Sequence, residues 1–168
     1  MSDVESSWEN RMAALWDTFD DHAPDDFVAQ VERLAAELPP HNAIGLFERA
    51  SAHDSTGRPD IAVPLYRDAL NAGLGGRRRR EATIQLASSL RNLGQAGEAS
   101  KLLVDELRAS SDDLDGAVRA FLALALVDLG REREAVGISL TALSEYLPQY
   151  NRSLARYASE LTTQVEPR

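Results

Sequence analysis

The chain has 168 residues, of which 43% are hydrophobic and 27% charged, a composition typical of a globular protein with its own core. It contains no cysteine, which excludes disulfides, cysteine-ligated zinc and thiol catalysis. The net charge is −9, and residues 1–26 contribute most of it with eight acidic side chains and one basic one, so we expect no nucleic-acid partner.

The first predicted elements are two helices within residues 1–40. One helical stripe of residues 4–21 is apolar: Trp8, Met12, Leu15, Trp16 and Phe19. The second helix, in "PDDFVAQVERLAAELPP", has a Pro–Asp start and ends at a pair of prolines. We interpret the two as a degenerate helix pair in which Trp8 and Trp16 pack on Phe27, Val31 and Leu34. The alternative is an acidic arm that docks on a second protomer or fills a groove.

Three glycines between helical segments mark a repeated unit over residues 43–148. Gly57, Gly94 and Gly130 lie 37 and 36 residues apart, and such a glycine ends a helix by taking a positive φ. Alanines stand seven residues before and five after each glycine: Ala50, Ala87, Ala123, Ala62, Ala99 and Ala135. Larger aliphatic residues stand eight and thirteen after: Leu65, Leu102, Ile138, Leu70, Leu107 and Leu143. The alanines permit close helix approach, and we expect the aliphatic residues to fill the seams between hairpins.

This pattern resembles the tetratricopeptide repeat, and the first copy fits it well with Ala50–His53–Gly57–Ala62–Tyr66–Ala69. The segment "QLASSLRNLG" is similar in sequence to segments of small bacterial stand-alone members of that family. The resemblance implies an all-α fold: a right-handed superhelical stack of antiparallel helix pairs, about nine helices in all. We expect a single domain over 1–168, with a helix pair in 1–40, three repeats in 43–148 and a capping helix in 149–165.

Two further details concern individual helices. In the capping helix we expect Leu154, Tyr157 and Leu161 to point inward. Pro64 lies about one turn inside its helix, which predicts a late start or a slight bend.

The resemblance also implies a function: a non-catalytic adaptor or scaffold that binds a peptide or protein segment in a concave groove lined by the first helix of each repeat. The candidate groove residues carried over from the family are Phe47, Asp54, Ile84, Gln85, Ser88, Arg91, Asn92, Leu124 and Asp128. Family members that grip a peptide carboxylate use Lys, Asn and Arg, which are replaced here by Phe47, Ser51, Gln85, Ala117 and Phe121. We therefore expect no chaperone-tail binding. Arg91 either contacts the ligand or pairs with Asp54 or Asp128.

The run Arg77, Arg78, Arg79 and Arg80 is the most visible charge cluster. One interpretation is an anion or nucleic-acid site. However, four cations at a helix N-terminus oppose the macrodipole, at a cost of ~0.3–1 kcal/mol each when exposed, and therefore require acidic neighbours or an anionic ligand. We favour partners within the chain, among them the acidic N-terminal segment.

Catalytic, metal and cofactor sites are not predicted. His22, His41 and His53 lie in separate segments without metal-ligand spacing, and we expect His53 to be a packing residue. No phosphate-binding loop is present. A remaining alternative is a purely structural module that self-associates, for instance as a homodimer. Since no apolar run approaches the ~20 residues of a membrane helix and "MSDVESSWENR" is no secretory signal, we expect a cytoplasmic protein without a membrane partner.

Overall fold

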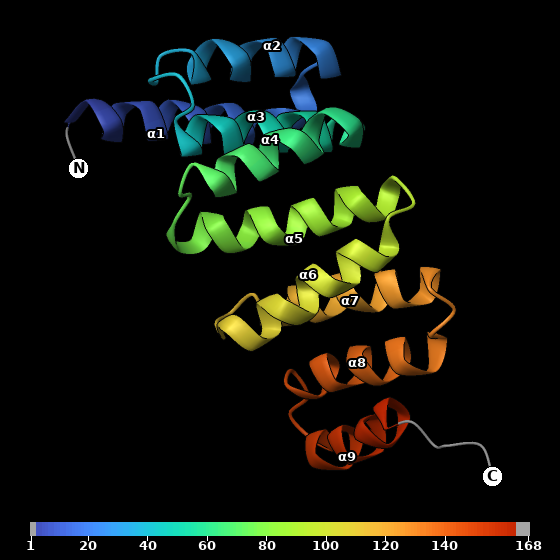
Figure 1. The fold of residues 1–168 in the computed structure, drawn as a ribbon. Helices are drawn as coiled ribbons and strands as arrows, with labels where there is room; N and C mark the ends of the chain where they lie inside the picture. The colour runs from blue at the N-terminus through green and yellow to red at the C-terminus, as the bar shows by residue number, and fades with distance from the viewer. Residues whose placement is uncertain (1–2, 164–168) are drawn as a thin grey trace. The chain divides into compact units, whose positions relative to one another are not determined.

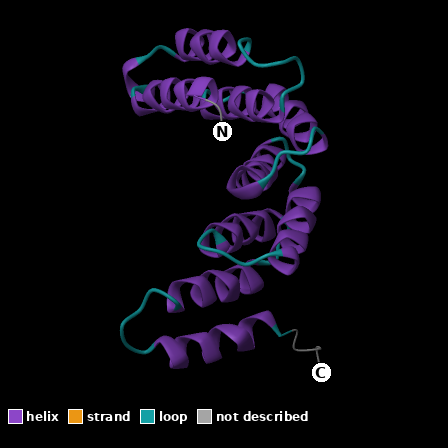
Figure 2. Cartoon of the chain, turned by 90° about the vertical axis from the view of Figure 1, so that its left-hand side faces the viewer, coloured by secondary structure: helices purple, strands orange, loops and turns teal. Residues whose placement is uncertain are grey.

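The computed structural model describes residues 3–163, and these fold entirely into helices and connecting turns (Figures 1 and 2). The described residues form nine α-helices and one 3-10 turn: α1 (Asp3–Asp17), η1 (Phe19–Asp21), α2 (Pro24–Ala35), α3 (Ala43–Ser55), α4 (Pro59–Asn71), α5 (Gly76–Asn92), α6 (Ala96–Ala109), α7 (Asp115–Asp128), α8 (Glu132–Ser144) and α9 (Asn151–Thr162). The predicted all-α class and helix number are confirmed for this part of the chain. Residues 164–165 of the predicted capping helix lie outside the described residues.

The chain divides into two compact units, residues 1–82 and 83–168, and the boundary falls within α5. The single domain expected over 1–168 stays a prediction. In the first unit α1 to α4 precede the first turns of α5, and in the second unit α6 to α9 follow its last turns.

Helix α1 is packed into the core of the first unit. Its residues Trp8, Met12 and Leu15 are buried together with Phe27 and Val31 of α2. The indole Nε1 of Trp8 donates a hydrogen bond of 2.8 Å to the carbonyl oxygen of Leu34. The predicted packing of the aromatic stripe on α2 is therefore confirmed, and α1 is an integral helix of this unit rather than a free arm.

The three repeat glycines end their helices in the same way. Gly57, Gly94 and Gly130 have φ angles of 78°, 77° and 70°. In each copy the glycine amide bonds to the carbonyl three residues back, at 2.9–3.0 Å, and the next amide bonds to the carbonyl five residues back, at 2.8–2.9 Å. This Schellman pattern satisfies carbonyl groups that the helix end would leave unpaired. The six predicted alanines are at most 6% exposed, which confirms their packing role: Ala50, Ala62, Ala87, Ala99, Ala123 and Ala135.

Helices α8 and α9 of the second unit approach closely at Gly137. A methyl group at that position would lie 2.8 Å from the carbonyl oxygen of Ala158 and 2.7 Å from Cγ2 of Thr162. Ala158 itself is fully buried. The pairing of α9 with α8 therefore depends on the absence of side-chain atoms at Gly137.

Three sequence predictions about single residues are wrong. Tyr157 is 54% exposed, with the guanidinium of Arg156 4.8 Å from its ring centre, so it does not point inward. Leu143, in the last turn of α8, is 49% exposed and so fills no seam. At Pro64 the late start is wrong, since α4 begins at Pro59, where a proline needs no amide partner, and continues through Pro64; the slight bend predicted as the alternative stays a prediction.

Candidate functional site

The ends of α5 and α7 meet in the second unit through an ion pair. The Nε atom of Arg91 lies 2.6 Å from Oδ2 of Asp128, and one terminal nitrogen of Arg91 donates a bond of 3.4 Å to Oδ1. Both side chains are about one-third exposed. Asn92 is exposed beside Arg91 and occupies the same repeat position as Asp128, two residues before the helix-ending glycine. Of the two ion pairs expected for Arg91, the structure shows the one with Asp128.

Next to this ion pair, helix α7 presents large apolar side chains to solvent. Leu124 and Val127 are 45% and 48% exposed, and their spacing places both on the helix face that carries Asp128. Leu129 at the end of α7 is 41% exposed. We call Arg91, Asn92, Leu124, Val127 and Asp128 the α5–α7 surface: apolar side chains bordered by a polar edge.

The other predicted groove residues lie in different environments. Ile84 is buried, while Gln85 and Ser88 on α5 are half-buried. In the first unit, Phe47 is buried with its ring centre 6.3 Å from that of Tyr66, and Oδ2 of Asp54 accepts a hydrogen bond of 3.5 Å from the Tyr66 hydroxyl. The side chains of Phe47 and Ile84 therefore contribute to helix packing.

Tyr66 is the fully buried centre of the α3–α4 hairpin. Its hydroxyl oxygen also lies 3.4 Å from Oγ of Ser51. Burial raises the pKa of Tyr66 far above its ordinary value, so the phenol stays protonated and serves as a donor. These contacts give Tyr66 a packing role.

The arginine run has partners within the first unit. Nε of Arg77 donates a hydrogen bond of 2.8 Å to Glu81. Arg78 forms a bidentate ion pair with Glu9 of α1, in which Nη1 of Arg78 lies 3.0 Å from Oε1 of Glu9. Nε of Arg78 also lies 3.5 Å from Glu48. Arg80 is buried and Arg79 half-buried. For Arg77 and Arg78 the expected partners within the chain are confirmed, including one from the acidic N-terminal segment.

Glu48 is a buried acid that sequence reasoning missed. The residue is 5% exposed, and its carboxylate accepts a hydrogen bond of 2.8 Å from the indole Nε1 of Trp16. Burial raises the pKa of Glu48, whereas the Trp16 bond and the charge of Arg78 act in the opposite direction. Any acidic residue on a helix is expected to face solvent, so only the three-dimensional contacts reveal this one.

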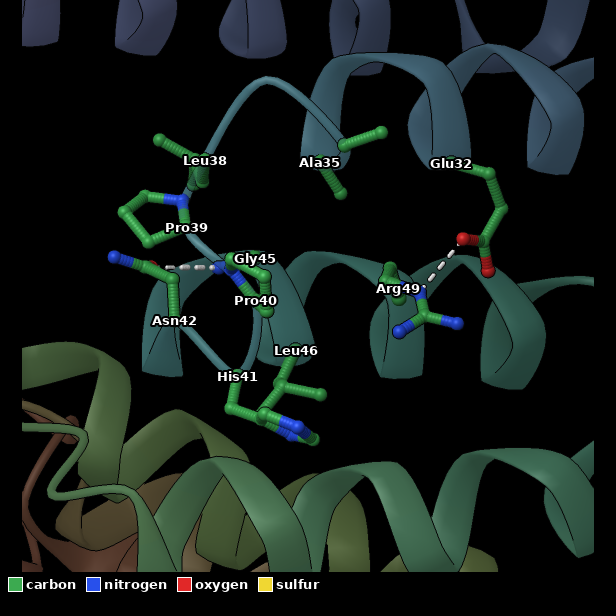
Figure 3. A pocket seen from close by; sticks show the side chains of 11 residues that line it. Glu32, Ala35, Leu38, Pro39, Pro40, His41, Asn42, Gly45, Leu46 and Arg49 are labelled. Atoms are coloured by element: carbon green, nitrogen blue, oxygen red, sulfur yellow. Dashed lines mark hydrogen bonds and ion pairs between the residues drawn. The ribbon is translucent and has the colours of Figure 1, made fainter.

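A cavity of about 350 Å³ lies in the first unit between the end of α2, the connection before α3 and the first turns of α3 (Figure 3). Leu38, Pro39 and Leu46 form apolar parts of its lining, and Glu32 and Arg49 supply charged groups. The sequence contains no pattern that predicts this cavity, because its walls come from a loop conformation and two helices.

Residues 3–163 contain no group of three or more His, Cys, Asp or Glu side chains arranged to hold a metal ion. None of the helices described is both long and apolar enough to cross a bilayer.

Comparison with known proteins gave one match. A family model described as "Tetratrico peptide repeat" matches residues 43–161, which include the three glycine-centred repeats and α9. No curated protein and no solved structure matches the chain significantly.

Proposed function

Because the chain belongs to the tetratricopeptide repeat family, we propose that it is a non-catalytic interaction module that binds a segment of another protein on the α5–α7 surface. Family members are in general protein-interaction modules. The observation that carries the proposal is the exposure of Leu124 and Val127 beside the Arg91–Asp128 ion pair.

The chemistry of this surface suits a protein segment with both apolar and polar groups. Leu124 and Val127 are 45% and 48% exposed, so a ligand that covers them buries apolar area at a gain of ~25 cal/mol per Å². The ion pair already holds Arg91 and Asp128 in one geometry, so a ligand would restrict them little further. Asn92 adds an amide donor and acceptor at the polar edge.

The test starts from peptides captured from a digest of native lysate on the immobilised protein. The affinity of a captured peptide is then compared among the wild type, Leu124→Asp and Val127→Asp. The matched control is Val136→Asp on α8, because Val136 is also 49% exposed and lies in the same unit. We expect both α7 variants to weaken binding about tenfold or more, since a buried charge replaces apolar contact, while the control retains wild-type affinity.

Two results would contradict this assignment. If both α7 variants bind as the wild type does, the peptide lies elsewhere. If no peptide is captured but Val127→Asp converts a dimer into a monomer in sedimentation, the surface binds a second copy of the chain, which is the structural alternative predicted from the sequence.

A further inference from the structure

The cavity beside α3 has the size and the charges of a small-molecule site. Its volume of about 350 Å³ falls in the range of roughly 300–1,000 Å³ that such sites occupy. Figure 3 shows Glu32 and Arg49 on one side of it and the connection from Pro39 to Asn42 on the other. It therefore combines the acid Glu32, the bases Arg49 and His41, and an apolar wall.

The two charged groups are held next to each other. Nε of Arg49 donates a hydrogen bond of 2.7 Å to Oε2 of Glu32, and Nε2 of the buried His53 lies 3.6 Å from the other carboxylate oxygen. Arg49 and His53 stand one turn apart on α3, which places both on the face that meets α2. Glu32 is thus fixed from two directions.

The outer edge of the Arg49 guanidinium remains available. Within residues 3–163 the contacts of Arg49 engage its Nε atom, and the two terminal nitrogens have no partner. Two parallel N–H groups of a guanidinium match the two oxygens of a carboxylate. The Arg49 side chain is 36% exposed, so a ligand can reach it from solvent.

The connection from Pro39 to Asn42, which borders the cavity, is held by its backbone conformation and by the Asn42 side chain. His41 has a φ of 61°, a left-handed conformation that is uncommon for a residue with a side chain. The side chain of Asn42 accepts bonds from the amides of Ile44 and Gly45 at 2.9 Å and 3.1 Å. Those amides at the start of α3 are therefore already satisfied, and charge recognition in the cavity falls to Arg49 and Glu32.

We propose that this cavity binds a free amino acid with an aliphatic side chain. The ligand carboxylate pairs with the terminal nitrogens of Arg49, and its ammonium group pairs with the carboxylate of Glu32. The aliphatic side chain lies against Pro39 and Leu46. Adjacent opposite charges on the protein match adjacent opposite charges on the ligand, so a molecule with only one of the two charges leaves a partner unsatisfied. The site lies wholly in the first unit and does not depend on the α5–α7 surface.

The experiment is an NMR titration of the full-length protein with L-leucine, which follows the amide of Gly45 and the Nε–H of Arg49. The analogues 4-methylpentanoate and 3-methylbutylamine keep the aliphatic body and carry one charge each. The variants are Arg49→Gln and Glu32→Gln. The matched control is Arg11→Gln, which removes the ion pair with Glu37, 2.5 Å long and outside this cavity. Circular dichroism establishes that each variant retains its helices.

We expect saturable shifts with leucine and binding about tenfold weaker or more for either analogue and either cavity variant, the effect of one lost charge-assisted hydrogen bond. The Arg11→Gln protein should bind leucine as the wild type does. The proposal is overturned if leucine gives no saturable shift, if the analogues bind as tightly as leucine, or if Arg11→Gln weakens binding as much as the cavity variants do.

Discussion

The guanidinium of Arg91 lies 2.6 Å, measured from Nε to Oδ2, from the carboxylate of Asp128, a residue 37 positions later in the chain. The separation is one residue more than the Gly94–Gly130 repeat, because Arg91 stands three positions and Asp128 two positions before the helix-ending glycine. The pair therefore joins the first helices of two successive repeats at the same end.

This ion pair is expected to contribute modestly to stability, since both side chains are about one-third exposed. Arg91→Ala and Asp128→Ala should each lower the free energy of unfolding by about 0.2–1 kcal/mol, and a double-mutant cycle should give a coupling energy in the same range. Urea unfolding measures both. Salt at about 1 M should remove most of the coupling. A coupling energy that salt leaves unchanged would contradict this description.

Gly137→Ala should destabilise the second unit by about 1–3 kcal/mol, because the added methyl group overlaps the Ala158 carbonyl oxygen, which is backbone and cannot rotate away. Gly97→Ala is the control, since that helical glycine has no neighbour within 4 Å of the added methyl group. It should stabilise α6 by up to about 1 kcal/mol through helix propensity. Thermal unfolding distinguishes the two. Equal effects would mean that the α8–α9 approach is looser than described.

Gly94→Ala should cost about 1–2 kcal/mol, because Gly94 has a φ of 77° and alanine is strained in that region. Gly94→Asn should cost less, since asparagine tolerates the left-handed conformation. The position is open, with no atom within 4 Å of an added Cβ, so the difference reports backbone strain rather than a clash. Denaturant unfolding of both variants checks the ranking, and a costlier asparagine would refute it.

Glu48 should make stability depend on pH in a predictable direction. Burial raises its pKa above the ordinary 4.5, so the folded protein binds the proton more tightly than the unfolded chain does. Its contribution is therefore full below about pH 4.5 and is lost as pH rises through the raised pKa. Glu48→Gln stays neutral, and its amide oxygen can accept the Trp16 bond.

The measurement is urea unfolding of the wild type and Glu48→Gln at a series of pH values. The free energy of unfolding of the variant minus that of the wild type should increase with pH across this window and then level off. Groups common to both proteins cancel in the difference. A difference that decreases with pH would show that Arg78 outweighs burial at this site.

Trp8→Ala should destabilise the first unit by about 3–5 kcal/mol, because the side chain is 4% exposed and its indole bonds to Leu34. The control is Asn10→Ala, an exposed position on the same helix, which should stay within about 0.5 kcal/mol of the wild type. Calorimetry measures both. Equal stability of the two variants would restore the interpretation of α1 as a free arm.

Much of the fold was predictable because it depends on backbone conformation within a few residues and on small side chains that recur at a fixed spacing. A glycine that takes positive φ ends a helix whatever packs around it, and Gly57, Gly94 and Gly130 do so. The burial of Ala50 and the corresponding alanines followed from their period. The candidate site was predicted less completely: the sequence left Asp54, Asp128 and a ligand as alternative partners of Arg91, and the period alone did not distinguish exposed Leu124 from buried Ile84.

The order of the helices, their breaks and the spacing of the repeats could be read from the residues, because helix period and backbone conformation act within a few residues of the chain. Which polar groups meet depends on the three-dimensional packing. Arg78 bonds to Glu9, 69 residues away, Glu48 is buried beneath Trp16, and Glu32 and Arg49 face one cavity. Those contacts depend on how each helix is rotated and inclined against its neighbour, and a difference of one side-chain position along a helix turns a residue by about 100°, from a buried face to an exposed one.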